Sequence, residues 1–77
     1  MNIRYARHAR NRMRLYDVSE DDVRLLLERG ERQSGRGTSL KAEGAIEGIG
    51  TTIVFHEEDD EIVVLTVWSD IKTRRGA

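Results

Sequence analysis

The stretch that decides the fold is Tyr5–Tyr16, which reads YARHARNRMRLY. Wound as an α-helix at about 100° per residue, it gathers four side chains on one stripe: Ala6, Ala9, Met13 and Tyr16. This spacing is typical of a helix that packs on a core, so we predict a helix over residues 6–15. His8 and Arg12 lie four residues apart on one flank of the stripe. An imidazole beside a permanent cation makes this pair the first candidate for chemistry.

A second helix is predicted by its start and stop signals. Ser19 is a typical N-cap, and Asp22 three residues later completes a capping box. We interpret the acidic run Glu20–Asp22 as helix capping rather than as metal binding. An apolar stripe follows at Val23, Leu26 and Leu27. Gly30 is expected to end the helix as its C′ residue.

The remaining segments predict strands and the turns between them. Residues 1–5 fit a short strand, and residues 31–39 fit a loop with a short edge strand inside it. Residues 40–47 alternate apolar with polar side chains, with Gly44 as a candidate bulge. Residues 51–56 are rich in β-branched side chains and predict a second strand. Residues 57–60 are expected to form a polar hairpin loop, and residues 70–77 a charged tail. Residues 61–69 are apolar on both faces and predict a central strand.

This order of elements predicts an α+β fold with a single domain over residues 1–77. Two N-terminal helices are expected on one face of a three- to four-stranded antiparallel sheet, in two layers. The other sheet face would then be a groove, a dimer interface or a partner site. Strict alternation puts Trp68 in the row of Ile62, Val64 and Thr66, and leaves open which row faces the helices.

Composition excludes several classes of protein. The 77 residues contain no cysteine and only two histidines, which excludes a disulfide framework, a thiol nucleophile and a structural zinc site. No long apolar run follows the charged N-terminus, so we expect no signal peptide and no membrane span. The expectation is a cytoplasmic protein with no cofactor.

The net charge of −1 hides an asymmetry along the chain. Residues 1–41 carry ten Lys/Arg against six Asp/Glu, whereas residues 42–77 carry three against eight. Such a split arises when two halves attract each other, or when one face is basic and binds nucleic acid. The sequence pI of about 6.1 favours mutual attraction, because nucleic-acid binders are usually basic overall.

Three motifs stand in a recognisable order: His8-Ala9-x-x-Arg12-Met13, Val18-Ser19-x-x-x-Val23, and the closing strand VVLTVW at residues 63–68. Together they resemble a small family of uncharacterised bacterial domains related to the RelE/ParE and BrnT toxins. The resemblance implies a RelE-like two-layer fold. It also implies a toxin-like component of a bacterial toxin–antitoxin system, with metal-independent endoribonuclease activity as one outcome.

The resemblance marks His8 and Arg12 as catalytic positions. His8 would act as base or acid on the 2′-hydroxyl or the leaving oxygen, and Arg12 would clamp the phosphate. The residues expected to bind substrate are Tyr5, Arg36, Lys41, Thr66 and Trp68. RNA and an antitoxin protein are the expected partners.

An alternative stays open, in which the chain is a catalytically inactive RelE-like binding or regulatory module. It would act through protein–protein contacts, for example as a homodimer formed on the open sheet face. His8 would then tie the first helix to the sheet by a hydrogen bond, and Arg12 would pair with Glu43 or Glu47. His56, beside four acidic residues, is interpreted as a solvated turn residue.

Overall fold

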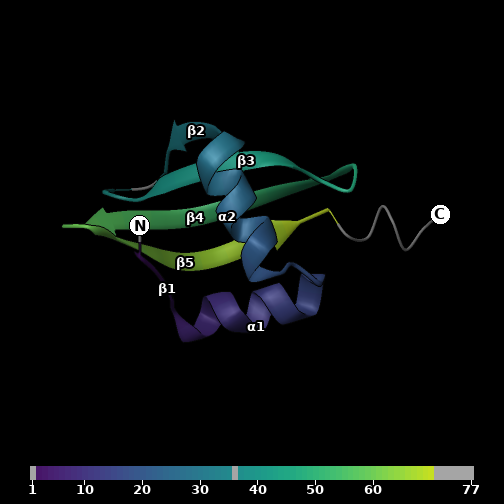
Figure 1. The fold of residues 1–77 in the computed structure, drawn as a ribbon, viewed down its shortest axis with the longest axis horizontal. Helices are drawn as coiled ribbons and strands as arrows, with labels where there is room; N and C mark the ends of the chain where they lie inside the picture. Colours follow the sequence, from purple (N-terminus) through teal and green to yellow (C-terminus); the bar gives the residue numbers. More distant parts are fainter. Residues whose placement is uncertain (1, 36, 71–77) are drawn as a thin grey trace.

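The computed structural model describes residues 2–35 and 37–70, which form two helices against a five-stranded sheet (Figure 1). The strands are ordered β1-β5-β4-β3-β2 across the sheet. In chain order the elements are β1 (Asn2–Tyr5), α1 (Arg7–Tyr16), α2 (Glu20–Arg29), β2 (Glu31–Ser34), β3 (Leu40–Ile46), β4 (Ile49–Glu58) and β5 (Glu61–Ser69).

The chain is α+β, but the prediction of a RelE-like layer of three or four antiparallel strands is wrong. The sheet has five strands and is mixed, because β1 pairs in parallel with β5, with Ile3 opposite Ile62. A parallel neighbour needs a long connection, and residues 6–60 supply it. Sequence reasoning treated residues 1–5 as a short strand without a partner, and therefore missed this pairing.

The fifth strand, β2, is an exposed edge strand whose sequence ERQS shows no apolar alternation. It pairs with β3, and the long side chain of Arg32 adds contacts to the core. The Arg32 guanidinium lies 5.3 Å from the centre of the Phe55 ring and donates a hydrogen bond of 3.0 Å to the Leu27 carbonyl. Arg32 therefore covers the end of the core as an aliphatic residue would.

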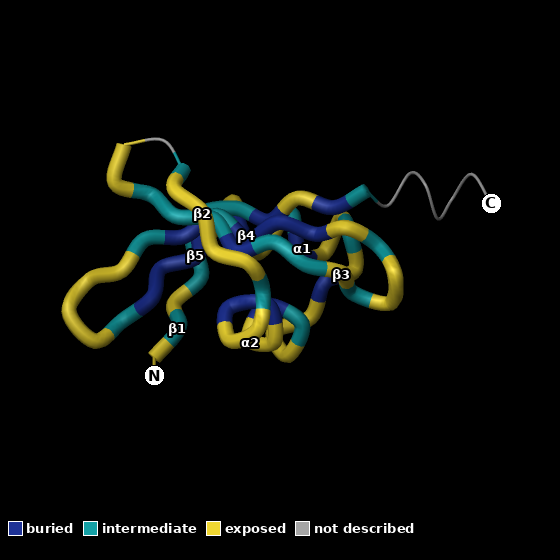
Figure 2. The backbone as a smooth tube through the Cα atoms, turned by 90° about the horizontal axis from the view of Figure 1, so that it is seen from above, coloured by how far each residue is buried: buried dark blue, intermediate teal, exposed yellow. Residues whose placement is uncertain are grey.

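Helix α2 lies across one face of the sheet, over β3 and β4 (Figure 1). The predicted capping box is confirmed: the Asp22 amide donates to the Ser19 hydroxyl, and the Ser19 amide donates to the Asp22 carboxylate, both at 3.0 Å. The predicted stripe is confirmed too, since Val23, Leu26 and Leu27 are all buried. Figure 2 shows the buried side of α2 turned toward the sheet.

Helix α1 lies beside the second half of β5. The Ala6 amide donates to the Val64 carbonyl at 2.9 Å, directly before the helix begins. At the other end, Tyr16 and Ser69 line one pocket. The helix therefore runs in the same direction as β5, with Ala9 and Met13 buried in the core. It ends at Asp17, which has a left-handed conformation with φ 58°.

A β-bulge changes the faces of β5. Phe55 pairs with Val64, whereas the preceding Val54 pairs with Thr66, so Leu65 is an extra residue on β5. The strict alternation expected from the sequence is therefore wrong. Ile62, Val64 and Val67 face the helices and belong to the core cluster. Val63, Thr66 and Trp68 project from the opposite side, called here the open face of the sheet.

Two glycines have roles other than those expected. Gly30 follows α2 with φ −69°, so it is not the left-handed C′ residue. A Cβ at Gly30 would lie 2.5 Å from the Leu26 carbonyl oxygen and 2.9 Å from that of Glu43. Gly44 lies in a regular part of the β3–β4 register, so no bulge occurs there. Its missing Cβ leaves room for the Leu26 side chain.

The β3–β4 hairpin turns at Glu47 and Gly48, which both have positive φ, of 53° and 80°. This is the pattern of a type I′ turn, whose twist matches the paired strands. The β4–β5 hairpin turns later than expected, at Asp59 and Asp60, because β4 extends through Glu57 and Glu58. The strand predicted over residues 61–69 begins and ends as β5 does. Residues 71–77 of the expected tail lie outside the described residues. In the part that the structure describes, no helix has the length and apolar character needed to cross a membrane.

Candidate functional site

The strongest sequence candidates, His8 and Arg12, lie on the side of α1 that faces away from α2. The opposite side of α1 contacts α2, where Arg10 forms an ion pair of 2.8 Å with Glu20. His8, Arg12 and Leu15 are spaced four and three residues apart, so they share one helix face. Because α1 runs beside β5, this face adjoins the open side of that strand.

His8 and Arg12 are in direct contact. The Arg12 Nε donates to His8 Nε2 over 3.4 Å, near the outer limit of a hydrogen bond. His8 is exposed and Arg12 is half-buried. With Nε2 as acceptor, the proton of a neutral imidazole lies on Nδ1. Among the described residues, Arg12 forms no ion pair, so its guanidinium charge is available to an anion.

Two residues of the closing strand project on this side. Thr66 is half-buried and Trp68 is 56% exposed, and both lie on the open face of β5. Together with His8 and Arg12 they form what we call the α1–β5 surface. Lys41 lies further along the open face, two strands away in the row Lys41–Val54–Thr66. The structure thus brings His8 and Arg12 into contact on α1 and places Thr66, Trp68 and Lys41 on the open face of the sheet.

Tyr5 is not among them. It pairs with Val64 on the helix-covered face, and the Arg10 guanidinium lies 4.6 Å from its ring centre. Burial raises the pKa of the Tyr5 hydroxyl, and the carboxylate of Glu20 raises it further. Arg36, the remaining predicted substrate residue, lies outside the described residues.

Among the described residues, His8, Arg12 and His56 make other contacts than the structural ones expected of them. The hydrogen bond of His8 is to Arg12 on its own helix, not to the sheet. Glu43, proposed as a partner of Arg12, accepts from the Gln33 amide at 2.6 Å and from the Thr52 hydroxyl at 3.4 Å. His56 is a half-buried strand residue with Glu58 at 3.4 Å, rather than a residue of the turn.

Charge is segregated along the sheet. The β4–β5 hairpin carries five consecutive acidic residues at one end: Glu57, Glu58, Asp59, Asp60 and Glu61. Arg4 lies against it, 3.3 Å from Glu58 and 3.4 Å from Glu61. The exposed cations Arg7 and Arg14 lie on α1, which begins beside Val64 and runs away from that hairpin. No group of three His, Cys, Asp or Glu side chains in the described chain could hold a metal ion.

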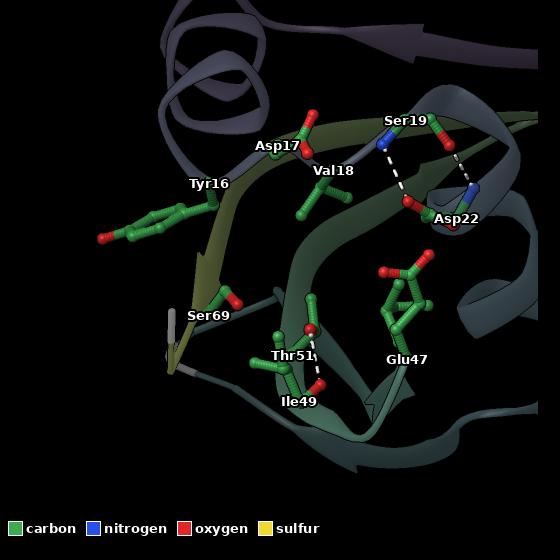
Figure 3. Close-up of a pocket in the computed structure, with 10 residues that line it drawn as sticks. Tyr16, Asp17, Val18, Ser19, Asp22, Glu47, Ile49, Thr51 and Ser69 are labelled. Carbon is green, nitrogen blue, oxygen red and sulfur yellow. Dashed lines mark hydrogen bonds between the residues drawn. The ribbon is translucent and has the colours of Figure 1, made fainter. Parts of the chain in front are cut away.

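Sequence reasoning missed one pocket entirely. It has a volume of about 280 Å³ and lies between the α1–α2 turn and the β3–β4 turn (Figure 3). Asp17, Asp22 and Glu47 line it, together with the buried hydroxyl residues Thr51 and Ser69. The only sign of the pocket in the sequence is that Thr51 and Ser69 occupy core-facing positions near the ends of β4 and β5. This sign does not indicate which residues lie across the pocket from them.

The chain was compared with models of protein families, with curated proteins and with solved structures, and nothing matched in any of the three.

Proposed function

We propose that the protein is a toxin-like, metal-independent endoribonuclease whose active site is the α1–β5 surface. The observation that carries the proposal is the contact between His8 Nε2 and Arg12 Nε on an exposed helix face. A base and a cation in contact are the two groups that metal-free cleavage of RNA requires at the 2′-hydroxyl and the phosphate.

The chemistry follows from which groups can move. A phosphate that binds the Arg12 guanidinium by two hydrogen bonds draws it away from His8. His8 Nε2 then accepts the proton of the ribose 2′-hydroxyl. The 2′-oxygen attacks phosphorus and the bond to the 5′-oxygen breaks as water donates a proton to that oxygen. The hydroxide that remains takes the proton from His8, which restores the neutral imidazole. The products are a 2′,3′-cyclic phosphate and a 5′-hydroxyl.

The neighbouring strand supports the same reading. The exposed ring of Trp68 offers a flat surface on which a base can stack. The Thr66 hydroxyl is a hydrogen-bond donor for a phosphate or a ribose. Lys41 adds charge further along the open face, where the next nucleotide of a strand laid across the sheet would lie.

The test compares wild type with three variants that each change a single residue of α1. Wild type, His8→Ala and Arg12→Ala are expressed in bacteria and assayed on single-stranded RNA in the presence of EDTA. Arg14→Ala is the matched control, because it removes an exposed cation from the α2 side of the same helix. We expect His8→Ala to lose cleavage by about 10²–10⁴-fold and Arg14→Ala to retain it.

Circular dichroism of each variant separates loss of chemistry from loss of fold. A wild type that neither arrests growth nor cleaves RNA would overturn the proposal. So would full activity in His8→Ala.

A second candidate function is a non-catalytic binding module that dimerises through the same surface. Trp68 on the open face of β5 is 56% exposed, and Leu15 on the neighbouring helix α1 is 61% exposed. Exposed large apolar side chains that lie together mark contact sites more often than scattered ones do. Light scattering over a range of concentrations tests this candidate, since a strict monomer contradicts a homodimer. Trp68 is the one tryptophan of the sequence, so its fluorescence reports burial directly.

A further inference from the structure

The pocket of Figure 3, which we call the Asp17 pocket, forms where the core row of the sheet ends. On β4 and β5, the core-facing pair Ile53–Val67 is followed toward the end of the sheet by the pair Thr51–Ser69. Two small hydroxyl residues thus replace the apolar pair beneath the α1–α2 turn. A pocket of about 280 Å³ lies beside these two hydroxyl residues.

One polar group that lines this pocket, the Ser69 hydroxyl, has no hydrogen-bond partner among the described residues. Thr51 is satisfied, because its hydroxyl donates to the Ile49 carbonyl at 3.0 Å. Ser69 is only 8% exposed, and its hydroxyl has no hydrogen bond to any of the residues that the structure describes. Figure 3 shows the Ser69 hydroxyl extending from β5 into the pocket. Among the described side chains, no fully buried polar atom lacks a hydrogen bond, so the Ser69 oxygen is reached from the pocket and can accept a hydrogen bond from a ligand there.

The rim of the pocket is acidic. Asp17, Asp22 and Glu47 contribute carboxylates from the α1–α2 turn, the first turn of α2 and the β3–β4 turn. None of the described residues that line it is Lys or Arg. Asp22 uses one oxygen, Oδ2, for the Ser19 amide, which leaves the other oxygen to accept a further hydrogen bond.

We propose that the Asp17 pocket binds a guanidinium group. A planar cation with several N–H donors matches a site that offers carboxylate oxygens and one buried hydroxyl oxygen. A bare metal ion does not match it, because the carboxylates of the described residues do not converge as a metal site requires. The volume is slightly below that of ordinary small-molecule pockets and suits one side-chain-sized group.

A guanidinium can reach the pocket from two sources. One is a separate molecule that carries it. The other is the chain itself, because Arg74 and Arg75 follow Ser69 by five and six residues in the sequence. Both sources present the same chemistry, so the experiment has one arm for each.

The first arm titrates N-acetyl-arginine amide into the full chain and follows the backbone amides of the α1–α2 turn and the β3–β4 turn by NMR. N-acetyl-citrulline amide is the matched control, because it has the same shape without the charge. We expect shifts at both turns with the arginine compound only. Asp17→Asn and Ser69→Ala are each expected to weaken binding about tenfold or more, whereas Asp60→Asn, in the distant hairpin, leaves it unchanged.

The second arm repeats the titration on Arg74→Gln/Arg75→Gln in the full chain. Binding that appears only in this variant supports the proposal and identifies the chain's own arginines as the occupant. Binding in wild type supports it with a separate molecule as the occupant. The proposal is overturned if neither protein binds, if the citrulline compound binds equally well, or if Asp17→Asn and Ser69→Ala leave the affinity unchanged.

Discussion

Leu26 shows how one buried side chain determines the residues around it. It lies on α2 and is 3% exposed. Its methyl carbon Cδ2 lies 2.5 Å from the position of a Cβ at Gly44, and its carbonyl oxygen lies 2.5 Å from the position of a Cβ at Gly30. Close packing of α2 on β3 therefore requires glycine at position 30, where backbone oxygens are close, and favours it at position 44, where only the end of the Leu26 side chain is close. The conformational freedom of glycine has no part in it, since Gly30 has an ordinary negative φ.

Gly30→Ala tests this explanation. The new methyl would meet two backbone carbonyl oxygens, at 2.5 Å and 2.9 Å, and neither can move away by rotating a side chain. We expect the free energy of unfolding to fall by about 1–3 kcal/mol, measured by urea denaturation. The neighbouring Arg29→Ala changes an exposed helix residue and is expected to stay within about 0.5 kcal/mol of wild type. Equal stability of the two variants would refute the packing explanation.

At the scale of elements, α2 is the part of the molecule whose sequence and structure agree most closely. The Ser19 hydroxyl and the Asp22 carboxylate each satisfy an amide that the helix cannot satisfy itself. Both groups belong to one turn of chain, so no distant contact is needed to form them. The helix therefore begins at the same residue whatever packs against it.

Replacing Ser19 by alanine measures how much this cap stabilises the protein. We expect a loss of about 1 kcal/mol in the free energy of unfolding, because the Asp22 amide loses its acceptor. Ser19→Asp should recover most of that loss, since an aspartate accepts the same hydrogen bond and favours the positive end of the helix dipole. Thermal denaturation of the three proteins measures both effects. An unchanged melting temperature in Ser19→Ala would contradict the assignment of the cap.

The features that could be predicted from the sequence are those that depend on residues close together in the chain. The apolar stripes of both helices, the cap at Ser19 and the contact between His8 and Arg12 follow from helical spacing. The extra residue Leu65 depends on register with β4, which no local pattern specifies. That bulge decides that Val67 enters the core and Trp68 leaves it.

The candidate site divides in the same way. Arg12 and His8 could be paired from the sequence, whereas their proximity to Thr66 and Trp68 needs α1 to lie beside β5. Tyr5 is adjacent to this helix in the chain but lies on the other face of the sheet, because β1 pairs with β5 in parallel. The Asp17 pocket joins two turns that are distant in sequence, which is why its residues gave no joint signal.

At the scale of the whole molecule, the net charge of −1 is the sum of positive and negative charges that lie in separate regions of the surface. The acidic β4–β5 hairpin extends from one end of the sheet, where Arg4 partly neutralises it. Helix α1 carries exposed arginines along the second half of β5. A slightly acidic protein can therefore still present a cationic surface. Under the proposed function, the hairpin would act on RNA only through its long-range field.

Neutralising that hairpin tests the proposed function without altering the α1–β5 surface. Glu57→Gln/Asp59→Asn/Asp60→Asn raises the formal net charge from −1 to +2. Asparagine tolerates the positive φ of 50° at Asp59, so the turn should persist. We expect the triple variant to bind a labelled single-stranded RNA several-fold more tightly at 50 mM salt. The gain should shrink at 200 mM salt, because ions screen charges beyond a Debye length of about 10 Å or less. Fluorescence anisotropy measures both affinities.

Adding Arg12→Ala should remove the gain if RNA binds at the α1–β5 surface, and a gain that survives this change would place the RNA elsewhere.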